Sequence, residues 1–128
     1  MAYGFSIVQP QNVATEQFNT CETAVQKLTE PLGCVEMRVN QVVVEPGEVT
    51  TPHTHEGQEE VFVALTNGQI SIDGDVHDVP EGGIVRVHPV TTRNLLNQTD
   101  ATHVWLAIGA PPVGTVDDFG AYVIEDEA

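Results

Sequence analysis

The chain has 128 residues, of which 19 are acidic and four are basic, and its formal net charge is −15. Hydrophobic residues make up 41% of it, which excludes an extended disordered protein, and the length suits one domain rather than two. A surface this acidic repels nucleic acids and anionic membranes, and the longest apolar stretch, 104–110, is too short to span a bilayer, so we expect neither partner.

The first 34 residues have mixed polarity, with weak strand signals at 5–8 and 24–28. We expect this extension to wrap the outside of the domain or to pair with a second subunit. From residue 35 the pattern becomes regular and predicts a half-buried strand that ends at Pro46-Gly47. Such a strand would place four apolar side chains on one face: Val35, Met37, Val39 and Val43. A polar loop at 48–58 follows and holds two histidines.

Short strand patterns then follow closely, at 60–66, 69–73, 76–79, 84–87, 92–97 and 103–108. Asn67-Gly68 and Asp73-Gly74 suit two-residue hairpin turns, whose commonest type needs positive φ at both central positions. Many short strands without a convincing helix indicate an all-β sandwich or barrel.

Pro111-Pro112 ends the strand pattern. We therefore divide the single domain into an N-terminal extension at 1–34, a barrel at 35–112 and an acidic tail at 113–128. Phe119 and residues 122–124 of the tail could form one more edge strand or a contact with a partner.

The segment GEVTTPHTHEGQEE, at 47–60, holds the candidate metal-binding residues. His53 and His55 are two positions apart, so on an extended chain both imidazoles face the same way. A glutamate four or five positions further on can return across a short turn to the same side. Two neutral imidazoles and one carboxylate form a facial set for a divalent transition metal, with open positions for a substrate. Taken alone, the triplet also fits a polar loop with surface histidines.

The surroundings of these histidines resemble the first conserved motif of the cupin superfamily. Four residues fit that motif with its four-residue spacing: Gly47, His53, His55 and Glu60. Gly68 lies one residue beyond the place of the closing glycine. We prefer Glu60 to Glu59 as the carboxylate, because Glu60, Phe62 and Ala64 would then share an inward face; Glu59 remains the alternative.

A second stretch, 82–97, resembles the second motif of the same superfamily. Three residues fall on its first glycine, its histidine and its asparagine: Gly82, Arg93 and Asn97. His88 occupies the place of the motif's proline, and Val90 replaces its inner glycine. The histidine that would be the last metal ligand in the family is therefore Arg93 in this chain.

Arg93 changes the expected site, because an arginine stays cationic and offers no lone pair to a metal. Three orientations are open: inward and paired with Glu60, inward and binding an anionic substrate, or outward in solvent. We interpret the other histidines as structural, with His77 exposed and His88 at the barrel rim. His103 alternates with Trp105 on its strand and is an alternative third imidazole.

The resemblance implies a small, single-domain jelly-roll barrel of two antiparallel sheets, and commonly a homodimer. The leading hypothesis is an enzyme that holds Fe, Mn, Ni or Zn on His53, His55 and Glu60. Arg93 would anchor a small anionic substrate for dioxygenase- or isomerase-like chemistry. The alternatives are a non-catalytic module that binds a small acid and a metal-free structural relic.

The acidity is spread evenly, with nine acidic residues in 1–64 and ten in 65–128. Repulsion between so many like charges is screened by concentrated salt, which favours an origin in a halophilic archaeon. The N-terminus lacks the basic start and apolar run of a signal peptide, so we expect a cytoplasmic protein. Cys21 and Cys34 are interpreted as reduced thiols.

Overall fold

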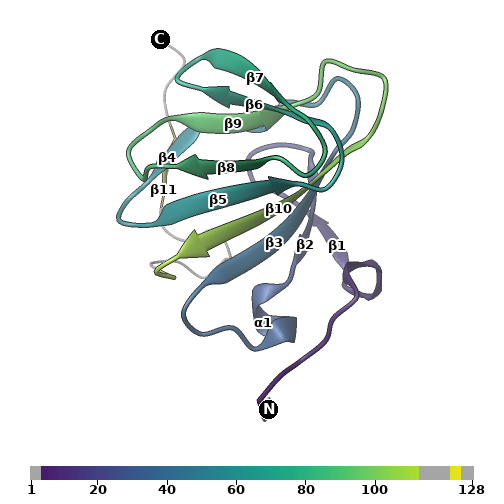
Figure 1. Ribbon diagram of the computed structural model, residues 1–128, viewed down its shortest axis with the longest axis vertical. Coiled ribbons are helices and arrows are strands. Elements are labelled where there is room, and N and C mark those ends of the chain that lie inside the picture. The colour runs from purple at the N-terminus through teal and green to yellow at the C-terminus, as the bar shows by residue number, and fades with distance from the viewer. Residues whose placement is uncertain (1–3, 113–121, 125–128) are drawn as a thin grey trace.

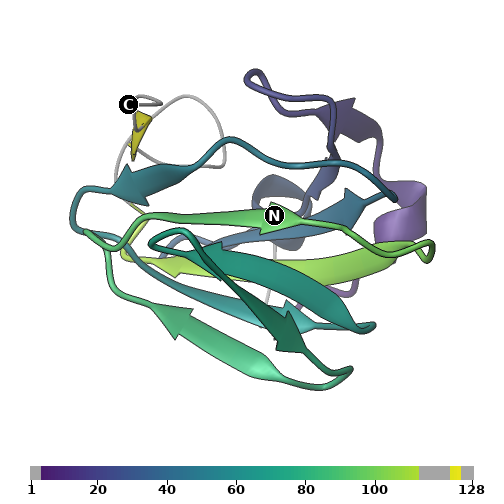
Figure 2. The ribbon, with the colours of Figure 1, turned by 90° about the horizontal axis from the view of Figure 1, so that it is seen from above.

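The computed structural model describes residues 4–112 and 122–124, which form two antiparallel sheets around a common interior (Figures 1 and 2). The first sheet has the order β1 (Thr15–Gln17), β2 (Ala24–Lys27), β3 (Arg38–Val44), β10 (His103–Ala110), β5 (Glu59–Ala64) and β8 (Ile84–Val87). The second has the order β11 (Tyr122–Ile124), β4 (His53–His55), β9 (Arg93–Leu96), β6 (Gly68–Ile72) and β7 (Asp75–Val79). The predicted all-β barrel of two antiparallel sheets is confirmed.

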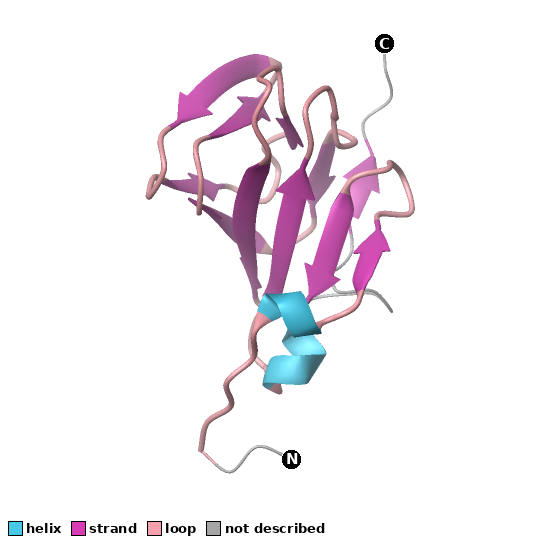
Figure 3. Ribbon diagram, turned by 90° about the vertical axis from the view of Figure 1, so that its right-hand side faces the viewer, coloured by secondary structure: helices cyan, strands magenta, loops and turns pink. Residues whose placement is uncertain are grey.

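Helical structure is confined, within the described residues, to the 3-10 turn η1 (Pro10–Asn12) and the short helix α1 (Thr29–Leu32). Figure 3 shows the helical segments at one end of the barrel. Neither of them has the length and hydrophobicity that crossing a membrane requires.

The core lies between the two sheets and is built from the alternate side chains that face inward. Its buried members are Val25, Val42, Val44, Phe62, Ala64, Ile70, Val79, Val87, Leu95, Trp105 and Ala107. Trp105 is fully buried and meets the Phe62 ring edge-on at 6.1 Å between centroids. Trp105 is therefore a core residue, and the predicted inward face of Phe62 and Ala64 is confirmed.

The face predicted for the first regular strand is wrong except at Val39, which is buried as predicted. β3 begins only at Arg38, so Val35 and Met37 precede it and are exposed. Val42 and Val44, on the opposite face from Val43, enter the core instead. The physical reason is that three consecutive valines are apolar on both faces, so alternation cannot determine which face is buried.

The two predicted hairpin turns have different outcomes. Asp73-Gly74 joins β6 to β7 with Ile72 opposite Asp75, and its φ angles of 50° and 88° are both positive, as predicted. Asn67-Gly68 is no hairpin turn, because it links β5 and β6, which belong to different sheets. Gly68 is required by close packing: a Cβ there would lie 2.4 Å from Trp105 Cζ2.

The flanking segments also differ in part from expectation. Residues 5–8 form no strand, whereas the signal at 24–28 corresponds to β2. β1 and β2 extend the edge of the first sheet, so part of the N-terminal extension belongs to the barrel wall. In the tail, β11 confirms an edge strand at 122–124; Phe119 lies outside the described residues.

The charge distribution leads to a prediction about salt. Of the acidic side chains that the structure describes, all but Glu48 and Glu60 are exposed. The screening length falls from about 30 Å at 0.01 M salt to about 3 Å at 1 M, so repulsion among exposed carboxylates should weaken. We expect the melting temperature, followed by circular dichroism, to rise clearly over this range. A flat or falling curve would contradict the screening explanation of the composition.

Candidate functional site

The two histidines of the predicted cluster lie on β4, a three-residue strand within the segment predicted as a loop. Its extended backbone places both imidazoles on the same side, and their rings meet edge-on with centroids 4.9 Å apart. β4 is anchored where His53 pairs with Arg93 of β9 and where the His55 amide donates to the Pro89 carbonyl at 2.8 Å.

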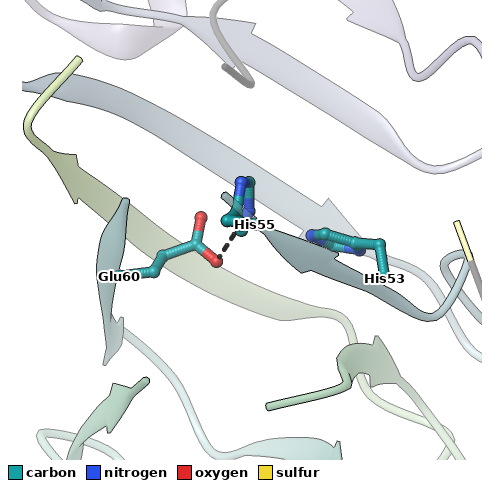
Figure 4. Close-up of side chains that lie close together, drawn as sticks. All are labelled: His53, His55 and Glu60. Atoms are coloured by element: carbon teal, nitrogen blue, oxygen red, sulfur yellow. Dashed lines mark ion pairs between the residues drawn. The ribbon is translucent and has the colours of Figure 1, made fainter. Parts of the chain in front are cut away.

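Glu60 reaches the histidines from the other sheet. It lies on β5, two residues before Phe62, and its carboxylate points toward the imidazoles (Figure 4). Glu60 Oε1 is 3.5 Å from His55 Nε2, and one ligand atom from each of the three residues lies within 4.8 Å of the others. The structure thus brings together His53, His55 and Glu60. The neighbouring Glu59 is exposed and forms an ion pair with Arg86.

The donor set fits a divalent transition metal. Imidazole nitrogen and carboxylate oxygen are ligands that Fe, Mn, Ni and Zn accept. His53 Nδ1 lies 2.9 Å from the Thr51 carbonyl oxygen, which can only accept a hydrogen bond. Nδ1 therefore carries the proton, and the lone pair of the neutral ring is on Nε2. A backbone carbonyl that fixes the tautomer in this way is a usual support for a metal-binding histidine.

Arg93 lies inside the barrel beside this cluster, so the outward orientation is wrong. Its side chain is fully buried, its Nη1 is 3.3 Å from Glu60 Oε1, and its Nη2 donates to the His88 carbonyl at 2.7 Å. Arg93 Nε is also buried and has no hydrogen-bond partner among the described residues. Pairing with Glu60, one of the three orientations left open by the sequence, is what the structure shows.

Burial and charge act in opposite directions on these groups. Burial alone would raise the pKa of Glu60, but hydrogen bonding to His55 and the positive charges of His55, His53 and Arg93 outweigh it, so the pKa is lowered. Burial lowers the pKa of His53, against smaller opposing effects of Thr51 and Glu60. Both shifts favour the metal-binding forms, a carboxylate and a neutral imidazole. Burial also lowers the pKa of Arg93, an effect that Glu60 partly offsets.

The cluster lines a pocket that is partly open to solvent. Beyond the cluster the wall is largely apolar and includes Val42, Phe62, Leu95 and Ala107. Phe18, Thr20 and Cys21, from the loop between β1 and β2, also line it. The Thr51 hydroxyl donates to the Thr20 carbonyl at 3.0 Å, which ties this loop to the histidine strand.

Sequence reasoning missed these three loop residues, because their approach to β4 is a long-range contact without any periodic signal. Cys21 and Cys34 are both free thiols, as predicted.

The other three histidines and Asn97 lie outside the cluster of His53, His55 and Glu60. His103 is buried, with Nε2 3.0 Å from the Thr99 hydroxyl, and is not among the cavity residues, so it is no third imidazole. His77 and His88 are exposed, although the His88 carbonyl holds Arg93. Asn97 is structural: its side-chain amide donates to the Val44 and Ala101 carbonyls, and its oxygen accepts from Thr99.

The support of β4 leads to a second prediction. β4 shares one register pair with β9 but three with β11, so its outer edge is held by the C-terminal strand. Deleting residues 122–128 should weaken divalent-metal affinity about tenfold, the scale typical of lost ligand support. Titration with Co²⁺ measures this effect, and a chain lacking only 125–128 is the control. Equal affinity in both chains would show that β11 does not position the histidines.

Comparison with known proteins adds three findings. The Cupin domain family matches residues 40–109 of this chain. None of the curated proteins matches it. Among solved structures, a sugar phosphate isomerase of a cupin superfamily from Silicibacter pomeroyi is similar, with a TM-score of 0.75 and 17% identity over 96% of this chain and 95% of its own.

Two further structures are similar to this chain. A predicted oxalate decarboxylase from Thermotoga maritima has a TM-score of 0.72 and 17% identity, over 83% of this chain and 99% of its own. A polyketide cyclase from Streptomyces resistomycificus has a TM-score of 0.73 and 20% identity, over 82% of this chain and 78% of its own. At such identities the likeness shows a shared fold, and the activity must be argued from the site.

Proposed function

We propose, from the premise that this chain belongs to the cupin domain family, that it binds a divalent metal on His53, His55 and Glu60 and a small anionic molecule beside it. The observation that carries the proposal is the convergence of three ligand atoms, from strands of both sheets, within 4.8 Å of one another. These atoms face a cavity that is partly open, so a small molecule can approach them.

Fe, Mn, Ni and Zn all accept this donor set, and two histidines with one carboxylate are the usual ligands of iron in oxygen chemistry. A bound metal would act as a Lewis acid on an oxygen atom of the ligand. The protein's own residues supply the rest: Arg93 contributes a buried positive charge, and the apolar side chains of Phe62, Leu95 and Ala107 would shield one side of the ligand from water.

The first candidate function is an enzyme that oxygenates or isomerises a small molecule next to a carboxylate. The similar proteins named as a decarboxylase, an isomerase and a cyclase support a small-molecule role. The second candidate is a non-catalytic binding module. It is favoured by the cavity's chemistry, because among its described residues Cys21 is the only titratable group besides the cluster and Arg93.

An assay of turnover separates the two candidates. Untagged protein loaded anaerobically with Fe²⁺ or Mn²⁺ is mixed with a panel of small carboxylates, with and without oxygen, and products are followed by mass spectrometry. Turnover that depends on His53 supports the enzyme, whereas saturable binding without turnover supports the binding module. Protein that binds neither metal nor carboxylate would be the structural relic.

We also propose a homodimer in the cytoplasm of a salt-rich archaeal cell. The family resemblance, which commonly implies a homodimer, supports the dimer, and the even spread of 19 acidic residues supports the salt-rich setting.

The pKa shifts lead to a third prediction, on pH. Protons compete with the metal for imidazole lone pairs, and the lowered pKa of His53 means that this ring is protonated only below the ordinary value of 6.5. The lowered pKa of Glu60 keeps its carboxylate ionised throughout this range. Co²⁺ affinity should therefore be nearly constant from about pH 8 to 7 and fall below 6.5, by up to about tenfold per unit for each proton displaced. A marked fall already between pH 8 and 7 would contradict the assignment of His53.

A further inference from the structure

The net charge of the site differs from that of a site with the same metal ligands and no arginine. Without metal, the negative charge of Glu60 and the positive charge of Arg93 cancel. A divalent ion would therefore leave a net charge of about +2, where a site with the same ligands and no arginine would hold about +1. Arg93 is fully buried, so water and salt screen its charge poorly.

Several contacts hold the Arg93 side chain beside Glu60, so it cannot easily move away when a metal binds. Its Nη2 is held by the His88 carbonyl at 2.7 Å, and its backbone is paired with His53. Its Nη1 shares one oxygen atom, Glu60 Oε1, with His55 Nε2, at 3.3 and 3.5 Å. A metal at the cluster would thus compete with the guanidinium for Glu60 and would lie beside an uncompensated cation.

An anion that coordinates the metal would remove this excess charge. It would also offer an acceptor to the Arg93 guanidinium, whose residue lines the same cavity and whose buried Nε has no partner among the described residues. Leaving such a donor unsatisfied is costly, and a hydrogen bond to an anion is among the stronger kinds. Metal and anion would therefore each stabilise the other.

We propose that Arg93 couples the two ligands of this site, so that a divalent metal binds weakly alone and tightly together with a small carboxylate. The inference rests on the proposed function, because it places the metal on His53, His55 and Glu60. By thermodynamic linkage the effect is reciprocal, and the carboxylate binds more tightly to the metal-loaded protein by the same factor. Arg93 acts here through its fixed charge rather than as a metal ligand.

The test measures Co²⁺ affinity by absorbance, with and without saturating acetate, in perchlorate of constant ionic strength. Arg93→Met removes the buried charge, Arg93→Lys keeps it, and Arg86→Met removes a guanidinium from the exposed ion pair with Glu59. Acetate should tighten Co²⁺ binding at least tenfold in the parent, Arg93→Lys and Arg86→Met proteins, and less than about threefold in Arg93→Met. Acetamide, the neutral analogue of acetate, should have little effect in any of them.

The possible results distinguish failure of the coupling from failure of the proposed function. Metal binding with equal acetate effects in the parent and in Arg93→Met would overturn the coupling and leave the proposed function standing. No Co²⁺ binding in any protein, with or without acetate, would overturn the proposed function and the coupling with it. If Arg93→Met fails to fold by circular dichroism, the parent decides the matter: affinity for Co²⁺ that acetate leaves unchanged would overturn the coupling.

Discussion

The double variant His53→Ala, His55→Ala is expected to lose at least a hundredfold in divalent-metal affinity while keeping its fold. Both imidazoles lie on one short strand and face Glu60 within 4.8 Å. Their removal leaves a single carboxylate, which is too few ligands to retain a transition metal against water. β4 lies outside the main hydrophobic cluster, so the melting temperature without metal should fall by no more than about 10 °C, or roughly 1–2 kcal/mol.

Calorimetric titration with Zn²⁺ or Co²⁺ measures the affinity, and circular dichroism measures the melting temperature. The matched control is His77→Ala, which removes an exposed imidazole from the same chain. We expect this control to bind metal as the parent does. Equal affinity in the parent and in the β4 variant would place any bound metal elsewhere.

Arg93→His is expected to tighten divalent-metal binding by about tenfold to a hundredfold. Position 93 is opposite His53 in the antiparallel pair, and its side chain points into the cavity beside Glu60. The substitution adds an imidazole where the resemblance expects one, and it removes the cation that competes for the carboxylate. The ordinary structural and catalytic sites of such metals hold three or four protein ligands, so a fourth donor fits the coordination chemistry.

The same variant should bind small carboxylates less well, by about one to two decades, because the charge-assisted interaction is lost. Co²⁺ titration of Arg93→Met separates the two effects: its gain over the parent reports the lost charge, and the further gain in Arg93→His reports the added ligand. Arg86→His is the surface control. Unchanged affinity for both metal and carboxylates in Arg93→His would contradict the position assigned to Arg93.

The residues of the candidate site could be predicted because each depends on local geometry. Two histidines separated by one residue share a face on any extended segment, and β4 is extended. Glu60 could be chosen over Glu59 because alternation with Phe62 and Ala64 continues in β5, and both of these side chains are buried.

Other features depended on information that the local pattern does not contain. The apolar run of Val42, Val43 and Val44 gives no preferred face, so the burial of β3 is set by the strands packed against it. The role of Gly68 depends on Trp105, 37 positions away in the chain, and no turn signal reveals it. Likewise, the direction of Arg93 is fixed by its pairing with His53 across 40 positions.

The most direct test of the metal centre is a crystal structure of the protein soaked with Zn²⁺ or Co²⁺ in the presence of acetate, with anomalous diffraction recorded at the metal edge. We expect one anomalous peak between β4 and β5, at about 2.0–2.2 Å from a ring nitrogen of His53, a ring nitrogen of His55 and a carboxylate oxygen of Glu60. A map without a peak at these residues, with Glu60 still paired to Arg93 at saturating metal, would contradict the account.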